Sequence, residues 1–153
     1  MNRTIIKLFF YLCILTALPS YAQNAVHYYF KTMDIRNGLS QNTVYQILQD
    51  RKGFMWFGTK DGLNRYDGLS YRVYKKENSG LGKNFITALY EDHEGNIWIG
   101  TDGGVFIYNP VLDSFTAFNQ TSDKGTVIKD FVTMIGSDEY DNIWISVENQ
   151  GLF

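Results

Sequence analysis

The chain has 153 residues, a formal net charge of -2 and a hydrophobic content of 44%, which together exclude a disordered tail and allow a packed core. Its mild acidity argues against non-specific nucleic-acid binding, which needs a basic face to neutralise phosphates. Its single cysteine, Cys13, excludes an internal disulfide framework and a thiolate zinc site. The composition therefore indicates a globular protein that depends on its hydrophobic core.

The first 22 residues have the features of a secretory signal peptide. Arg3 and Lys7 give a positive start, residues 8–18 form an uncharged apolar run, and Ala22 ends a small-residue exit. The apolar run is too short for a membrane span, which needs roughly 20 residues. We therefore expect cleavage after Ala22. Removing 22 of the 153 residues would leave a mature chain of 131 residues with no cysteine, and losing the two basic residues would take its net charge from -2 to -4.

Three tryptophans mark an internal repeat. Trp56, Trp98 and Trp144 are 42 and 46 residues apart, and an aspartate stands six positions before each of them. A glycine stands three positions before the first two. Twelve positions before each tryptophan is a β-branched residue, namely Val44, Ile86 and Val132. A repeat of about 44 residues lies within the range of periods that includes propeller blades.

Short β-type runs separated by turns fill each repeat. In chain order, residues 28–33 are expected to form a lone strand, which in closed propellers commonly completes the last blade. The repeats predict strands at 43–49, 54–59, 63–66 and 71–74, then at 85–91, 96–101, 105–108 and 114–118, then at 131–135 and 142–147. The Asp-Gly pairs between runs favour hairpins because glycine accepts a positive φ. Four antiparallel strands in forty-odd residues is the build of a propeller blade.

The fold class predicted is therefore all-β: a partial β-propeller of two complete four-stranded blades plus part of a third, preceded by a signal peptide. The parts expected are a signal peptide (1–22), an N-terminal outer blade strand (23–37), propeller repeat 1 (38–80), propeller repeat 2 (81–126) and an incomplete propeller repeat 3 (127–153). Two and a half blades cannot close a ring of about 4 to 8. We therefore expect the chain to be a fragment or a truncated reading frame of a longer protein.

The repeated Asp-x-x-Gly-x-x-Trp segment has a structural explanation. The aspartate can accept hydrogen bonds from turn amides, the glycine takes a backbone conformation barred to other residues, and the tryptophan packs between adjacent sheets. These turns also lack the alternating Asp and Asn ligands of a calcium loop. We therefore interpret all three residue types as structural rather than ligand-binding.

The first repeat closely resembles the two-component regulator propeller repeat. The matching residues read GLSQNTV at 38–44 and QDRKGFMWFGTKDGLNRYDG at 49–68. This run looks like the first repeat at the amino end of hybrid two-component sensors, which carry their propellers in the periplasm of Gram-negative bacteria. The resemblance covers essentially residues 26–153. The third repeat departs from the pattern at Asp141, which replaces the usual glycine, and at Ser146-Val147, which replace Gly-Thr; its turn geometry is therefore open.

The resemblance implies a periplasmic sensory or ligand-binding propeller, secreted across the inner membrane. In the family such propellers often detect oligosaccharides released from polysaccharide breakdown, and a later part passes the signal to a kinase module. The partners implied are an oligosaccharide, the downstream blades and kinase module of the same protein, and a second copy in a homodimer, with no nucleic acid. Enzyme activity is not expected here, since any kinase activity would lie in a missing C-terminal region. A fragment of a secreted propeller enzyme acting on polysaccharide, and a protein-interaction scaffold, are the alternatives.

Chemical motifs give no catalytic, cofactor or metal site. His27 and His93 lack a metal-ligand spacing, so we expect both side chains to be exposed or in turns. Glu91, Asp92 and Glu94 form an acidic cluster beside His93, but acid–base catalysis needs a pocket, and the repeat already explains this turn.

Two further segments were considered. Residues 100–104 are glycine-rich, but they lack the lysine and the following helix of a phosphate loop. Asn119 begins a glycosylation sequon in form only. Ligands of a propeller usually meet loops at one mouth of the central channel, here around Asn42, Asn84 or Asp130, which precede the inner strands. Aromatic residues are expected to stack on sugar rings there, but sequence alone does not separate them from core aromatics.

Overall fold

The computed structural model describes residues 3, 27–119 and 127–153. The expected signal peptide, apart from Arg3, and the sequon beyond Asn119 lie outside the described residues. Residues 1–31 and 32–153 are separate units, and the fold is that of the second. Within the described ranges, no helix is long and apolar enough to cross a membrane.

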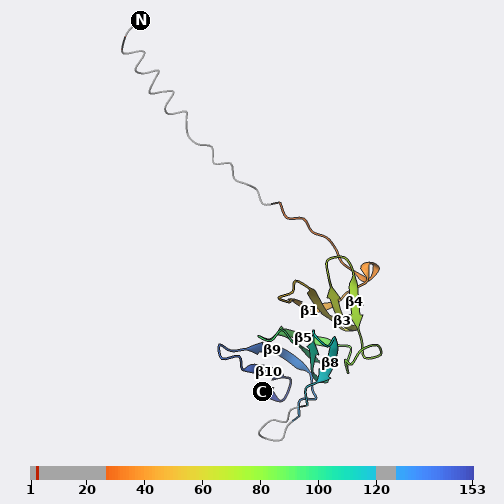
Figure 1. Ribbon diagram of the computed structural model, residues 1–153, viewed down its shortest axis with the longest axis vertical. Helices are drawn as coiled ribbons and strands as arrows, with labels where there is room; N and C mark the ends of the chain where they lie inside the picture. The colour runs from red at the N-terminus through yellow and green to blue at the C-terminus, as the bar shows by residue number, and fades with distance from the viewer. Residues whose placement is uncertain (1–2, 4–26, 120–126) are drawn as a thin grey trace. The chain divides into compact units, whose positions relative to one another are not determined.

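The described residues of the second unit contain three antiparallel sheets (Figure 1). A short 3-10 turn, η1 (Ile35–Asn37), comes before them. Blade 1 contains β1 (Val44–Gln49), β2 (Met55–Thr59), β3 (Gly62–Tyr66) and β4 (Tyr71–Tyr74); blade 2 contains β5 (Ile86–Glu91), β6 (Ile97–Thr101), β7 (Gly104–Asn109) and β8 (Ser114–Ala117); blade 3 contains β9 (Val132–Ser137), β10 (Ile143–Val147) and β11 (Gly151–Leu152). Each strand pairs with the next one within its blade. The all-β prediction of two four-stranded blades and part of a third is confirmed, with strand ends shifted by at most two residues.

The expected N-terminal strand does not form in this structure. Residues 27–34 contain no strand, whereas the sequence indicated one at 28–33. A strand is held by hydrogen bonds to a neighbour, and the neighbour expected here, the last blade of a closed ring, is not among the described residues. Pairing of this segment therefore stays a prediction.

The first strand of each blade, which we call its inner strand, is β1, β5 or β9, and these three strands lie next to one another in chain order (Figure 1). Strand β1 contacts β5, and β5 contacts β9. Two hydrophobic clusters fill the spaces between blades. The boundary of blades 1 and 2 buries Trp56, Leu63, Tyr74, Leu81, Ile86, Ile97, Ile99 and Tyr108, and the boundary of blades 2 and 3 buries Ala88, Val105, Ile128, Val132, Ile135, Ile145 and Val147.

Glycines in the second strands let the inner strands pack closely. A Cβ placed on Gly58 would lie 2.8 Å from Cγ2 of Ile86, and one on Gly100 would lie 2.6 Å from Cγ1 of Val132. These two glycines therefore receive the β-branched residues that the repeat places twelve positions before each tryptophan. Blade 3 has Ser146 at the same repeat position.

The Asp-to-Trp turns have the structural role expected of them. In blade 1, Oδ1 of Asp50 accepts the backbone N–H groups of Lys52 and Phe54. Its Oδ2 accepts the indole Nε1–H of Trp56 at 2.8 Å. The same aspartate-to-indole bond recurs from Trp98 to Asp92 at 2.8 Å and from Trp144 to Asp138 at 3.1 Å. This hydrogen bond to the indole explains why the aspartate stands six residues before the tryptophan in all three repeats.

The third turn keeps its geometry without glycine. Gly53 and Gly95 have φ angles of 89° and 86°, and Asp141, at the same place in blade 3, has φ 63°. Aspartate tolerates this left-handed region better than most residues because its short polar side chain can bond locally. The departure noted at Asp141 therefore leaves the turn intact.

Candidate functional site

The edge at which the inner strands begin also carries the turns between second and third strands. The N–H of Asp102, in the β6–β7 turn, donates to the carbonyl of Phe85 at 3.3 Å. The N–H of Glu148, in the β10–β11 turn, donates to the carbonyl of Phe131 at 2.8 Å. We call this side of the three blades the inner-strand edge. It is the side where the sequence placed a ligand-binding mouth.

The three residues singled out at this mouth each hold a loop in place. Oδ1 of Asn42 accepts the N–H of Ile35 at 3.0 Å. Oδ1 of Asn84 accepts the N–H of Lys76 at 2.7 Å. A carboxylate oxygen of Asp130 accepts the side-chain amide of Gln150. The three side chains therefore stabilise loops, and a ligand-binding role for them stays a prediction.

An aromatic row, which we define as Tyr45, Phe85 and Phe131, lies at the inner-strand edge with one ring from each blade. The ring centroids of Tyr45 and Phe85 are 4.7 Å apart with planes at 58°, and those of Phe85 and Phe131 are 5.6 Å apart at 84°. The rings belong to neither hydrophobic cluster. Tyr45 is 46% exposed, and both phenylalanines are half-buried. The row is therefore an aromatic surface that reaches solvent.

The aromatic row was not predicted from the sequence. Phe85 and Phe131 stand one residue before the β-branched position of their repeats, where blade 1 has Thr43. Tyr45 follows that position in blade 1. A comparison of the repeats could have signalled that aromatics gather around this position, but only the packing separates them from the rings of the core.

Charged side chains border the aromatic row. The ammonium nitrogen of Lys60 lies 5.9 Å from the ring centroid of Phe85, within the range of a cation–π contact. Lys83 reaches across the β6–β7 turn, since a Cβ on Gly103 would lie 2.9 Å from its Nζ. The ion pairs found among the described residues do not include either of these lysines. Two cationic groups thus stand at the inner-strand edge.

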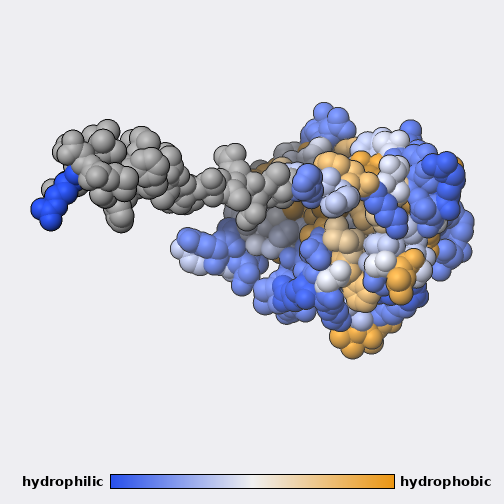
Figure 2. Space-filling view, turned by 90° about the horizontal axis from the view of Figure 1, so that it is seen from above, coloured by the Kyte–Doolittle hydropathy of each residue, from blue (hydrophilic) through white to orange (hydrophobic). Residues whose placement is uncertain are grey.

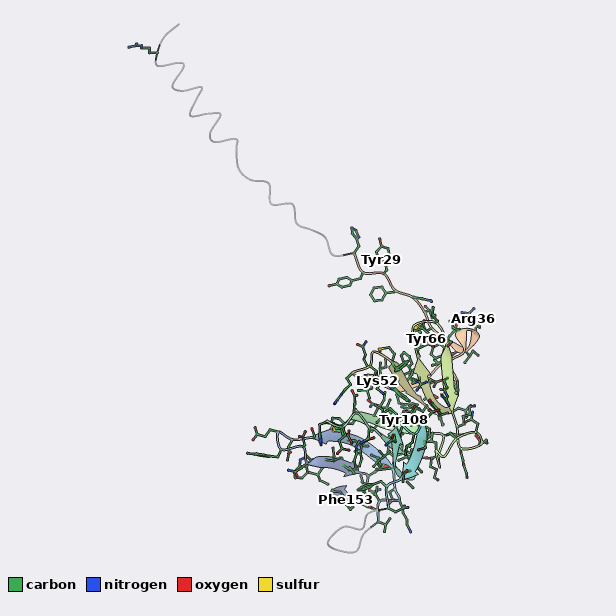
Figure 3. All side chains as sticks on the ribbon, in the orientation of Figure 1. Tyr29, Arg36, Lys52, Tyr66, Tyr108 and Phe153 are labelled. Atoms are coloured by element: carbon green, nitrogen blue, oxygen red, sulfur yellow. The ribbon has the colours of Figure 1, made fainter. Side chains whose placement is uncertain are left out.

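The opposite edge, at the turns between first and second strands, is tied together across blades. The guanidinium of Arg51 lies 3.1 Å from a carboxylate oxygen of Glu91. It also donates to the carbonyls of Asp92 at 2.5 Å and of His93 at 2.6 Å. Figure 3 labels the neighbouring Lys52, which is exposed. Arg51 therefore joins the turn of blade 1 to the turn of blade 2.

The acidic cluster beside His93 is part of this same turn. Glu91 pairs with Arg51, and Glu94 is exposed and accepts a hydrogen bond from the side chain of Asn96 at 3.2 Å. Burial raises the pKa of Asp92, but hydrogen bonds from Trp98 and Asn96 to its carboxylate outweigh burial and hold that pKa below its usual range. The cluster thus acts in packing and turn formation.

Neither histidine lies in a set of potential metal ligands in the part of the chain that the structure describes. The side chain of His93 is 61% exposed, with Nδ1 3.9 Å from the carboxylate of Asp141. Exposure of His93 in a turn is what its sequence setting predicted.

A second polar network spans blades 1 and 2 next to the core. The hydroxyl of Tyr108, which Figure 3 labels, donates to Asp113 at 2.7 Å and accepts from Arg65 at 3.0 Å. Arg72 of blade 1 pairs with the same Asp113 at 2.6 Å. Burial, and next the bond to Asp113, raise the pKa of the Tyr108 phenol, while the Tyr108 hydroxyl and Arg72 lower the pKa of Asp113. The network fixes the packing of the two blades.

Comparison with known proteins identifies the repeats. Residues 38–61 and 80–103 match the family described as two component regulator propeller. The chain is 42% identical over 59 residues to histidine kinase P4 of Formosa agariphila, a match that spans 39% of this chain and 4% of that protein. It is also similar in structure to the extracellular domain of a putative hybrid two component system from B. thetaiotaomicron, with a TM-score of 0.70 and 31% identity over 80% of this chain and 18% of that one.

A further neighbour is the extracellular domain of a putative one component system from the same organism. It has a TM-score of 0.69 and 30% identity, over 79% of this chain and 18% of the neighbour. The chain therefore spans less than a fifth of the length of each of these relatives. The chain therefore has blades of the β-propeller type, its residues 38–61 and 80–103 match the two component regulator propeller family, and its structure is similar to the extracellular domain of a putative hybrid two component system.

Proposed function

We propose that this chain is a non-enzymatic, ligand-binding segment of a periplasmic sensor in a two-component signalling system, and that its ligand is a glycan fragment. The observation that carries the proposal is the likeness, at 30–31% identity over about four-fifths of the chain, to extracellular domains of one- and two-component systems. Histidine kinase P4 is a further relative, and its name states a kinase activity. Kinase activity would belong to other parts of such a protein.

The site supports binding rather than chemistry. Two members of the acidic cluster beside His93 are engaged in turns, Glu91 with Arg51 and Asp92 with Trp98. Catalysis by a carboxylate needs it free to exchange a proton with a substrate. The aromatic row, in contrast, offers exposed ring surface bordered by cationic groups.

A glycan-binding screen tests the proposal. The full-length protein is applied to an array of oligosaccharides that includes neutral, uronate-containing and sulfated chains, and each hit is measured by calorimetry. The expected result is saturable binding of at least one oligosaccharide with no change in its mass or chain length after prolonged incubation.

Two results would count against the proposal. Cleavage of a bound oligosaccharide would favour the propeller enzyme. Absence of binding to every sugar on the array would remove the glycan ligand and favour a protein-interaction scaffold.

A further inference from the structure

We propose that the aromatic row of Tyr45, Phe85 and Phe131 is the surface on which this chain stacks its ligand, and that the ligand is an oligosaccharide lying across the inner strands of blades 1 to 3. The inference rests on the proposed function, because it assumes that the chain binds a glycan. It adds the residues that make the contact, none of which the sequence pattern had singled out.

The rings of the aromatic row are not part of the packing between blades. Each blade boundary already has its own hydrophobic cluster, with Trp56 and Tyr108 fully buried in the first. The rings of the aromatic row lie outside both clusters and keep contact with solvent. Exposed aromatic surface costs solvation free energy unless a partner covers it, so a contiguous patch of it points to binding.

The aromatic row is continuous across the three blades. The centroid separations of 4.7 Å and 5.6 Å bring together three rings that lie 40 and 46 residues apart in sequence, with successive ring planes at 58° and 84°. Sugar rings present apolar C–H faces that pack on aromatic rings, and their hydroxyl groups remain at the rim. Because the rings are tilted to one another, each offers its own contact to a sugar unit, and their spread over three blades favours an oligosaccharide over a monosaccharide.

Polar and charged groups lie around the aromatic row. Lys60 lies beside Phe85, and Lys83 crosses the neighbouring turn, so ammonium donors stand next to the stacking surface. Tyr45 brings a hydroxyl that can both donate and accept. Asp102 and Glu148 lie in the turns whose backbone bonds the two phenylalanines. This combination of apolar faces and polar rim groups matches the alternation of C–H faces and hydroxyls in a sugar chain.

Substitutions in the row test the inference. The strongest binder on the oligosaccharide array is titrated by calorimetry into the full-length protein and into Tyr45→Ser and Phe85→Leu. We expect each substitution to weaken binding about tenfold. Tyr45→Phe keeps the ring and should remain within about threefold of the original affinity, which separates loss of stacking from loss of the hydroxyl.

The matched control is Tyr140→Ser. Tyr140 is 76% exposed in the β9–β10 turn, at the opposite edge of the blades, and its substitution should leave affinity unchanged. Circular dichroism and the combined fluorescence of the three tryptophans confirm that each variant is folded. Phe85→Leu retains an apolar side chain, so the row remains testable if the serine variant does not fold.

The outcomes separate the two proposals. Binding that is unchanged in Tyr45→Ser and Phe85→Leu overturns the assignment of the row and leaves the glycan-binding function standing. Equal loss in Tyr140→Ser also overturns it, because the effect would then be general. Failure of the unsubstituted protein to bind any oligosaccharide overturns the proposed function and the row together.

Discussion

Gly100 offers a direct test of how the blades pack, through the substitution Gly100→Ala. A Cβ at this position would lie 2.6 Å from Cγ1 of Val132 and 2.9 Å from Cβ of Ala88. Both distances are well below ordinary contact, and the neighbours belong to packed inner strands. Overpacking of this kind costs about 1–3 kcal/mol. Alanine also restricts the backbone of the unfolded chain, which stabilises the folded protein by about 0.4–1 kcal/mol. We therefore expect a net destabilisation of about 1–2 kcal/mol.

The assay is urea unfolding followed by tryptophan fluorescence, because Trp98 packs at the boundary of blades 2 and 3. The shift in midpoint multiplied by the slope gives the change in unfolding free energy. Gly136→Ala is the matched control, since a Cβ there would meet nothing within 4 Å. It should leave stability unchanged or raise it by up to about 1 kcal/mol.

A double-mutant cycle identifies the cause. Val132→Ala removes Cγ1, the atom nearest to the new methyl group, so Gly100→Ala should cost less in that background than in the original protein. A coupling of about 0.5 kcal/mol or more is expected for residues in contact. Equal destabilisation by the Gly100 and Gly136 substitutions, or strict additivity in the cycle, would refute this account of the blade boundary.

Three other predictions follow from the polar contacts. Arg51→Ala should destabilise the protein by about 1 kcal/mol, because water competes with the bonds of an exposed guanidinium and leaves them only a modest net contribution. Lys52→Ala should change urea stability by less than about 0.5 kcal/mol. The side chain of Asn142, together with other donors in the turn, lowers the pKa of Asp138 from 3.8 to about 2. The ionised carboxylate of Asp138 therefore stabilises the fold above about pH 4, and this stabilisation is lost as the pH falls towards 2. A carboxyl NMR titration with a midpoint near the usual value would contradict this. Tyr108→Phe removes the hydroxyl whose hydrogen bond lowers the pKa of Asp113, so a carboxyl NMR titration should show a higher pKa for Asp113 in this variant. An unchanged pKa would show that the Tyr108 hydrogen bond is not its cause.

Local chemistry explains what the sequence predicted correctly. Asp-Gly turns and alternating apolar residues are signals within a few positions of each other, and they located the strands of blades 1 and 2. At Asp141 the sequence left the turn open because a positive φ favours glycine. The observed φ of 63° shows that the aspartate carries the same turn.

Contacts between repeats were harder to predict. Arg51 binds Glu91 forty residues away, yet the residues at its repeat position in the other blades are His93 and Glu139. A contact that does not recur gives no periodic signal. The aromatic row was missed for a related reason: the sequence shows that Phe85 is aromatic and starts a strand, and core rings share both properties.

The glycine contacts between blades give each boundary a direction. The earlier blade supplies the open position, Gly58 or Gly100, and the later blade supplies the inserted side chain, Ile86 or Val132. The two faces of a blade are therefore different, and a contact of this type is head-to-tail rather than self-complementary. Repeated head-to-tail contacts generate rings or open helical stacks, whereas a two-fold pair needs one surface that matches itself. Two copies of this protein related by a two-fold axis would accordingly have to meet through some other surface than the one that joins its blades.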